Sequence, residues 1–399
     1  MRIVLAYWVW LTMLPKLSKK QKIALLEAYS DPEDIYNESV YDHLPFLSTE
    51  TVEQLQNKDL RAARQVVKTC AEKQISMITI RDAAYPRRLR GTEDAPILLF
   101  YKGVLPDFDD RPTIGVVGTR KATGYGTTNA YRIAGQIAAC GGVVVSGGAF
   151  GIDTAALKGA LDAGCQVAAV LGCGVDVVYP RANKDLFQRI VRQGCLISEY
   201  LPGTEPYNWY FLERNRIISG MSNGVLVVEA PERSGALNTA KHAFSQGRDV
   251  FAVPGNIDVP NCSGSNALLH DFARAAMNGW DVMCEYADTY GETVQQRQFT
   301  PLPEVVQAPA DHRTPPAADK KGIDNPSINA YSDVENTDLQ LTDQERKLLS
   351  LIGGEPTPVD ELITQADMDA AVVLRIITKL SMRNVVILHP GKLVSVKNN

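Results

Sequence analysis

Two glycine turns, each directly after a short apolar run, are the segments of this 399-residue chain best suited to bind an anion. Gly118-Thr119-Arg120 follows the run 114–117, and Ser146-Gly147-Gly148 follows the run 143–145. Backbone N–H groups at such turns can face an anion, and the dipole of a following helix favours negative charge. Arg120 adds a guanidinium that can grip a phosphate through two hydrogen bonds, and Lys121 adds a second cation. The pattern predicts phosphate binding; the alternative for Gly118 is a tight turn without a ligand.

The second turn continues as Ala149-Phe150-Gly151-Ile152-Asp153. Its three glycines and serine precede a helical pattern, and together they predict a second phosphate cradle. Phe150 has two interpretations, because an aromatic ring in such a loop can stack on a base or pack into the core. Asp153 falls near the start of the helix, where a structural role is favoured: it can cap the helix or bond to the opposing turn.

Two further segments carry cations. Glu213-Arg214-Asn215-Arg216 precedes an apolar pair, and its two arginines cannot both be buried cheaply. A surface ion pair is one interpretation, but phosphate binding is favoured, because Ser234-Gly235 follows the next apolar run and opens another helix. The segment 179–184 contributes Arg181 and Lys184. Several separated phosphate sites suit a polyanion better than a mononucleotide.

The sequence argues against catalysis, metal binding and dinucleotide binding. Its five histidines form no nucleophile–base arrangement with these segments, and no metal-ligand spacing occurs. Neither Gly118 nor Gly124-Tyr125-Gly126 completes the G-x-G-x-x-G fingerprint. We therefore expect no catalytic residue, no metal and no cofactor. Since the formal net charge is -5, binding of a polyanion must rest on a local basic patch.

The predicted strands and helices that must position these turns alternate along the chain between about 111 and 288. Near-continuous apolar runs are separated by segments with helical periodicity, which is typical of a parallel sheet covered by helices on both faces. The predicted strands are 114–117, 143–145, 166–171, 195–198, 224–229 and 249–253. Ligands of such α/β folds bind at the carboxyl ends of the strands, where both glycine turns lie. We expect one site built from both turns.

Composition divides the chain into four parts. Residues 1–80 have helical patterns and predict a small N-terminal helical domain, and residues 81–290 contain the α/β core. Residues 291–338 are rich in proline and predict a linker. Residues 339–399 predict three helices and a hairpin, which together indicate a winged-helix module. The basic and acidic residues of this module balance, so it can read DNA or dock a protein.

The cysteines and the first apolar run indicate the compartment. The seven cysteines are scattered without a C-x-x-C pair, as expected of reduced thiols in a cytosolic protein. The run 3–14 is too short to span a bilayer, and Pro15-Lys16 follows it where a signal peptide would have small residues. It predicts a buried first helix, and the chain as a whole predicts a cytoplasmic protein without a membrane segment.

Taken together, the motifs resemble the DNA-processing protein A family (DprA, also Smf). They occur in order over roughly 85–278: VGTRKATGYG (117–126), SGGAFGID (146–153), YPRANKDL (179–186), ISEYLPG (197–203), FLERNRIISGMS (211–222), VVEAPERSGALNTA (227–240) and GRDVFAVPGN (247–256). The resemblance implies a bacterial, non-enzymatic protein that binds single-stranded DNA, protects incoming DNA in natural transformation and loads the RecA recombinase. It also implies an extended Rossmann core that dimerises, often with an N-terminal helical domain and a C-terminal winged helix.

The same resemblance implies roles for individual residues. Arg120 would grip a DNA phosphate and Lys184 would be a cation of the pocket. With the residues singled out above, the predicted site comprises Gly118, Thr119, Arg120, Lys121, Ser146, Gly147, Gly148, Phe150, Gly151, Lys184, Arg214, Asn215, Arg216, Ser234 and Gly235. Two features depart from the family. Phe150 stands where a basic residue is frequent, and the turn 15–18 lacks the glycines of a helix-hairpin-helix DNA clamp.

Two alternatives belong to other functional classes. The glycine turns are also similar to those of Rossmann nucleotide phosphoribohydrolases, but Glu229, the only plausible acid, precedes the glycine turn instead of following it. The other alternative is a docking scaffold that acts through the C-terminal module.

Overall fold

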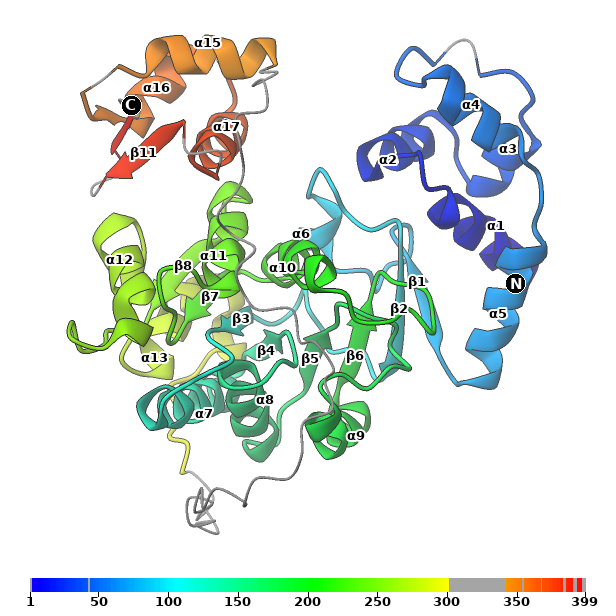
Figure 1. Ribbon diagram of the computed structural model, residues 1–399. Coiled ribbons are helices and arrows are strands. Elements are labelled where there is room, and N and C mark those ends of the chain that lie inside the picture. Colours follow the sequence, from blue (N-terminus) through cyan, green and yellow to red (C-terminus); the bar gives the residue numbers. More distant parts are fainter. Residues whose placement is uncertain are drawn as a thin grey trace, which may run out of the picture.

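The computed structural model describes residues 2–41, 44–300, 342–353, 355–366, 368–382, 385–389 and 393–396. Figure 1 shows a central sheet with helices on both faces, a group of helices against one edge of the sheet, and a small C-terminal domain on the opposite side. The predicted fold class is confirmed: a mostly parallel α/β core with an N-terminal helical domain and a C-terminal winged helix.

The central sheet has nine strands in the order β1-β2-β6-β5-β4-β3-β7-β8-β9. Seven are joined by parallel pairings: β3 (Thr113–Val117), β4 (Val143–Ser146), β5 (Val167–Val170), β6 (Cys195–Ser198), β7 (Gly224–Val227), β8 (Asp249–Ala252) and β9 (Arg274–Ala275). Two antiparallel strands, β2 (Leu98–Gly103) and β1 (Ser76–Thr79), extend the sheet beyond β6. All residues of β3 to β7 are buried, which explains their unbroken apolar runs.

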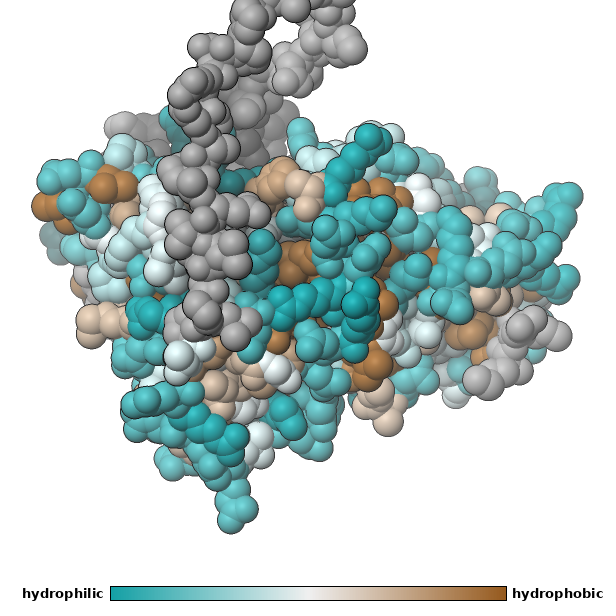
Figure 2. Space-filling model, turned by 90° about the horizontal axis from the view of Figure 1, so that it is seen from below, coloured by the Kyte–Doolittle hydropathy of each residue, from teal (hydrophilic) through white to brown (hydrophobic). Residues whose placement is uncertain are grey.

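The order of the strands reverses at β3, which lies between β4 and β7. One face of the sheet carries α7 (Gly124–Ala139), α8 (Ile152–Asp162) and α9 (Lys184–Gln193), and the other carries α10 (Asn208–Met221) and α11 (Gly235–Ser245). Figure 2 looks onto the molecule from below Figure 1 and shows a largely hydrophilic surface with separated apolar patches. A reversal of this kind opens a crevice at the carboxyl ends of the strands, which places the loops after β3, β4 and β7 together.

Shorter elements complete the core. The helix α6 (Arg87–Arg90) lies between β1 and β2 in the chain, and α12 (Ser263–Asp271), α13 (Gly279–Met283) and α14 (Ala287–Tyr290) follow β8.

The N-terminal domain consists of α1 (Arg2–Met13), α2 (Lys19–Ala28), α3 (Pro32–Asn37), α4 (Thr49–Gln56) and α5 (Arg61–Glu72). Val9 and Leu11 of α1 are fully buried, which confirms the prediction of a buried first helix. Ser18 begins α2 with a capping box that it forms with Gln21. The buried residues of this domain belong to the same hydrophobic cluster as one face of the sheet, so the domain is packed onto the core. Among the described residues, no helix is both long enough and apolar enough to cross a membrane.

The C-terminal domain contains α15 (Asp343–Leu351), α16 (Val359–Ala366) and α17 (Ala370–Met382) with the strands β10 (Thr357–Pro358), β11 (Val386–His389) and β12 (Leu393–Val396). The predicted hairpin is β11–β12, and β10 adds a third strand beside β12. The domain has its own hydrophobic core and contacts α11 through α17. Most of the predicted linker, residues 301–338, lies outside the described residues. The boundaries drawn at 80, 290 and 338 stay predictions.

Candidate functional site

The turns after β3 and β4 lie directly against each other. The backbone N–H of Ile152 donates to the carbonyl oxygen of Thr119 at 3.2 Å. A Cβ atom on Gly151 would lie 2.4 Å from that oxygen, and the φ of Gly151 is +73°, so only glycine suits this position. The structure therefore brings together the two turns from which the sequence predicted one site.

Arg214 lies beneath the β4 turn instead of at the surface. It is 3% exposed, and its guanidinium donates to the carbonyl of Gly147 at 2.8 Å and to the carbonyl of Val170. Beside it, the carboxylate of Asp153 accepts from the N–H groups of Gly147 and Ala149 at 3.1 and 3.3 Å. Burial lowers the pKa of Arg214 to about 10, which leaves the side chain charged at neutral pH. Burial raises the pKa of Asp153. The pair shapes the turn from below, so the structural role predicted for Asp153 is confirmed.

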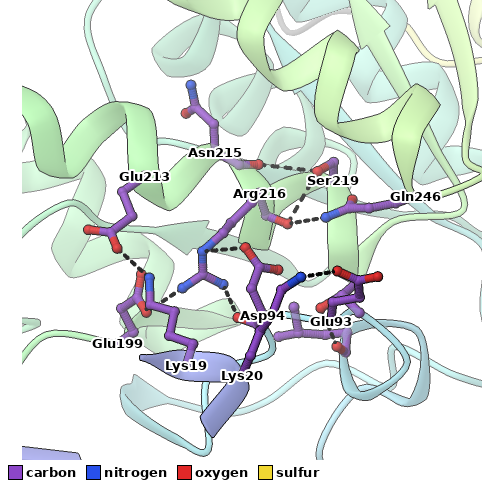
Figure 3. A network of polar contacts seen from close by, with 12 residues as sticks. Lys19, Lys20, Glu93, Asp94, Glu199, Glu213, Asn215, Arg216, Ser219 and Gln246 are labelled. Atoms are coloured by element: carbon purple, nitrogen blue, oxygen red, sulfur yellow. Dashed lines mark hydrogen bonds and ion pairs between the residues drawn. The ribbon is translucent and has the colours of Figure 1, made fainter. Parts of the chain in front are cut away.

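Arg216 is also 3% exposed and lies in a network of polar contacts with residues of other segments (Figure 3). It pairs with Glu199 at 2.5 Å and with Asp94 at 3.3 Å. Lys19 of α2 reaches the same network, at 3.3 Å from Glu199 and in contact with Glu213. Burial alone would lower the pKa of Arg216, but the surrounding carboxylates outweigh burial and raise it. Arg216 thus supports the contact between the core and the N-terminal domain.

Both arginines are thus buried, so the expectation that at least one of them lies at the surface, because burying both is costly, is wrong. The two residues are two positions apart on α10, about 200° around the helix axis, so they point to different sides. The guanidinium of Arg214 donates to backbone carbonyls, and Arg216 pairs with carboxylates from distant segments. The spacing of these two arginines in a helix could have shown, from the sequence alone, that they do not share a surface.

Several other predicted residues belong to the scaffold that holds the turns. The hydroxyl of Ser146 is fully buried and donates to the carbonyl of Val116 at 2.6 Å. Asn215 is 8% exposed, and its amide donates to the carbonyl of Gly235 at 3.1 Å, which joins α10 to the start of α11. Ser234 caps α11 by accepting from the N–H of Ala236 at 3.3 Å. Gly235 is exposed at this helix start.

The exposed part of the site begins at Arg120. Its guanidinium carbon lies 4.9 Å from the ring centre of Phe211, and that ring lies 5.4 Å from the ring of Tyr179. Lys121 is exposed beside it, and its carbonyl accepts from the amide of Asn261 at 2.8 Å. Sequence reasoning missed the role of Phe211, although it stands two residues before the predicted Glu213–Arg216 segment.

Phe150 is 48% exposed, which excludes the interpretation that it packs into the core. Stacking of Phe150 on a base stays a prediction.

Lys184 is exposed at the start of α9 and lies close to the β4 turn. Asn183 holds this position, because its amide donates to the carbonyl of Gly148 at 3.0 Å and to the hydroxyl of Thr154 at 2.8 Å. Arg181 is exposed in the same short turn. In the part of the chain that the structure describes, no ion pair joins a carboxylate to Arg120, Lys121, Arg181 or Lys184.

Glu229 follows β7 and lies beneath the loop that follows β3. It is fully buried, its carboxylate accepts from the N–H of Thr123 at 2.9 Å, and its carbonyl accepts from the N–H of Thr119 at 2.7 Å. A Cβ atom on Gly126 would lie 1.8 Å from the Glu229 carboxylate. This acid therefore braces the β3–α7 loop and does not reach the surface, which argues against the phosphoribohydrolase alternative. The described residues contain no group of three or more His, Cys, Asp or Glu able to hold a metal ion.

Comparisons with known proteins show the family of this chain. Residues 76–287 match the family described as DNA recombination-mediator protein A, and residues 335–392 match the DprA winged helix domain. The chain is 43% identical over 208 residues to the DNA processing protein DprA of Streptococcus pneumoniae, a match covering 52% of this chain and 73% of that protein. It is 31% identical over 324 residues to the protein Smf of Synechocystis, with 80% of each covered. The crystal structure of the Streptococcus pneumoniae DprA superposes with a TM-score of 0.58 at 34% identity, over 70% of this chain and 97% of that one.

Proposed function

This chain belongs to the DNA recombination-mediator protein A family, and from that premise we propose that it binds single-stranded DNA at the carboxyl edge of its sheet. The observation that carries the proposal is the set of exposed cations around the paired glycine turns. Arg120, Lys121, Arg181 and Lys184 surround backbone turns suited to phosphate, and none is neutralised by an ion pair among the described residues. Cations without a protein partner remain available to the phosphates of a nucleic acid.

A single strand suits this edge better than a duplex. The exposed ring of Phe150 and the half-exposed ring of Tyr179 lie among the cations, and only unpaired bases offer their faces to such rings. Contacts to phosphate and stacking both tolerate any sequence, so binding should be strongly salt-dependent and largely independent of sequence.

The proposed contacts fall into two groups. We assign direct contact with DNA to the surface residues Gly118, Arg120, Lys121, Phe150, Gly151, Arg181, Lys184 and Gly235. The buried Thr119, Ser146, Gly147, Gly148, Arg214 and Asn215 and the partly buried Ser234 shape the turns, and Arg216 acts in the domain contact.

The test replaces Arg120 by alanine. We expect the affinity for an oligo(dT) strand to fall roughly 5- to 150-fold, the equivalent of about 1–3 kcal/mol for a lost charge-assisted contact. The matched control is Arg111→Ala, which removes an exposed arginine just before β3, at the opposite edge of the sheet. Fluorescence anisotropy titrations at one fixed salt concentration measure both. Unchanged affinity in Arg120→Ala would remove this edge from the proposal.

We extend the proposal to the cellular role that the resemblance implies. The protein protects incoming DNA in the cytoplasm during natural transformation and loads RecA, acting without enzymatic activity as a homodimer formed through the core. Mass measurement by light scattering tests the dimer. A RecA strand-exchange assay, on DNA covered with single-strand binding protein, tests loading. Deleting residues 339–399 and measuring DNA affinity again tests whether the winged helix contributes to DNA binding or only to the binding of protein partners.

A further inference from the structure

A cluster of aromatic side chains at the start of α10 has no role in the site described above. Tyr207 is 56% exposed and Trp209 is 59% exposed. Both rest on Tyr210, with ring centres 5.6 Å and 3.9 Å away, and Tyr210 rests on Tyr200 at 4.1 Å. The two outer rings are supported from beneath while much of their surface remains in contact with solvent.

Such exposure has a cost, because large aromatic surfaces gain free energy when water is removed from them. Two neighbouring rings that are held by further rings, yet more than half exposed, form a small apolar surface of the kind that marks a binding site.

This surface is continuous with the cationic turns. Phe211, whose ring contacts Arg120, follows Tyr210 directly in α10. Tyr200 comes just after β6, whose carboxyl end lies at the same edge as those of β4 and β5 because these strands are parallel. Tyr207 lies one helical turn before Phe211, so a strand that extends from Arg120 along this end of α10 can reach the rings.

The charged residues near the rings also leave this surface able to bind a polyanion. Glu213 accepts from the hydroxyl of Tyr200 at 2.9 Å and pairs with Lys19, and Asp176 pairs with Lys73 at 2.5 Å. Two of the nearby carboxylates are thus neutralised by lysines. Glu205 is exposed, with no ion pair in the described part of the chain.

We propose that Tyr207 and Trp209 form a stacking platform for unpaired bases of the strand whose phosphates the cationic turns hold, an inference that rests on the proposed function. Every base has an apolar face, so the platform adds affinity without selecting a sequence. In a duplex the faces of the bases are already stacked, so the platform also favours single strands.

The first experiment separates stacking from phosphate contact. We expect Trp209→Ala to weaken binding of oligo(dT) by about 5- to 150-fold, the range for loss of one stacked base, and Trp209→Phe to retain most of the affinity. A strand of the same length built of abasic sites should bind wild type and Trp209→Ala equally. The matched control is Val104→Ala, an exposed apolar residue just after β2.

The second experiment uses the fluorescence of Trp209. The chain has four tryptophans; Trp8 and Trp10 are 3% exposed and Trp280 is partly buried, so Trp209 dominates quenching by acrylamide. Oligo(dT) should protect the wild type from quenching, and the protection should vanish in Trp209→Phe.

Three results would overturn the inference. Wild-type oligo(dT) affinity in Trp209→Ala, while Arg120→Ala weakens binding, leaves the proposed function standing and reassigns the rings to a protein partner. Equal losses on oligo(dT) and abasic strands show that the rings do not stack on bases. Wild-type affinity in both variants removes the platform and the proposed function together.

Discussion

The guanidinium of Arg120 lies over the ring of Phe211, 4.9 Å from its centre. A cation held over an aromatic face keeps its charge and loses some of its freedom. The ring belongs to α10, whereas Arg120 follows β3, so the position of the cation depends on both elements. The cation is oriented before any ligand arrives.

This arrangement predicts a difference between lysine and alanine at position 120. Arg120→Lys keeps the charge but loses the planar fork and the stacking, so its affinity for oligo(dT) should lie between those of wild type and Arg120→Ala. The slope of log affinity against log salt should stay near the wild-type value in Arg120→Lys and fall by about one in Arg120→Ala. Anisotropy titrations over a salt series measure both. Wild-type affinity in Arg120→Lys would show that charge alone acts here.

The contact between the two turns predicts that Gly151 cannot be replaced. In Gly151→Ala the new Cβ meets the carbonyl oxygens of Thr119 and Arg120, which must move. Gly164→Ala is the matched control, because its φ of +77° is similar to the +73° of Gly151 but open space surrounds it. Both variants carry the cost of positive φ, about 1–3 kcal/mol, which is the greater for Gly151→Ala because its ψ of -123° lies outside the left-handed helical region, and only Gly151→Ala should also lose DNA binding. Urea unfolding and anisotropy separate the two effects, and equal DNA affinity in both variants would contradict the prediction.

The buried charges of Arg214 and Asp153 predict a large effect on stability. Arg214→Met removes the hydrogen bonds to the carbonyls of Gly147 and Val170 and the positive charge near the buried Asp153 carboxylate, which should lower the free energy of unfolding by about 3–5 kcal/mol. Arg214→Met combined with Asp153→Asn should recover part of that loss, because no charge remains buried there. Urea unfolding monitored by circular dichroism measures all three proteins. A double variant less stable than Arg214→Met would show that Asp153 does not depend on Arg214.

The network around Glu213 predicts a dependence on pH. Burial alone would raise the pKa of Glu213, but Lys19, Tyr200 and Arg216 outweigh burial and lower it. A carboxylate with a lowered pKa stabilises the fold above its unfolded pKa, near 4.5, and this contribution disappears as the pH falls through the folded pKa. Wild type should exceed Glu213→Gln in stability at pH 6 by about 0.2–1 kcal/mol, since the side chain is partly exposed, and the difference should shrink below pH 4.5.

Urea unfolding over a pH series measures this difference. Glu232→Gln, which changes an exposed glutamate after β7 that takes part in no ion pair in the described part of the chain, is the control. A constant difference between wild type and Glu213→Gln from pH 6 down to pH 3 would contradict the assignment.

The sequence predicted the strands and the glycine turns because both leave local signals. Apolar runs such as 143–145 and the glycines that follow them depend on neighbours a few residues away. The contact between the turns after β3 and β4 could also be predicted from the sequence, since parallel strands end at a common edge of the sheet.

The surroundings of the arginines could not be predicted in the same way. Arg216 is buried because Asp94 and Glu199, far away in the chain, converge on it. Arg214 is buried because the carbonyls of Gly147 and Val170 accept from it. No local pattern in the sequence indicates such partners, so the cost of burying two cations favoured phosphate binding for both of them.

Glu93 follows α6, and each of its two carboxylate oxygens is engaged by a different terminal domain: Lys20 of α2 at 2.6 Å, and Arg375 of α17. Two positive side chains gathered on one carboxylate repel each other, so each weakens the hold of the other. One carboxylate thus takes part in the seating of both ends of the chain, beside the apolar surface that the N-terminal domain shares with the sheet and the contact of α17 with α11.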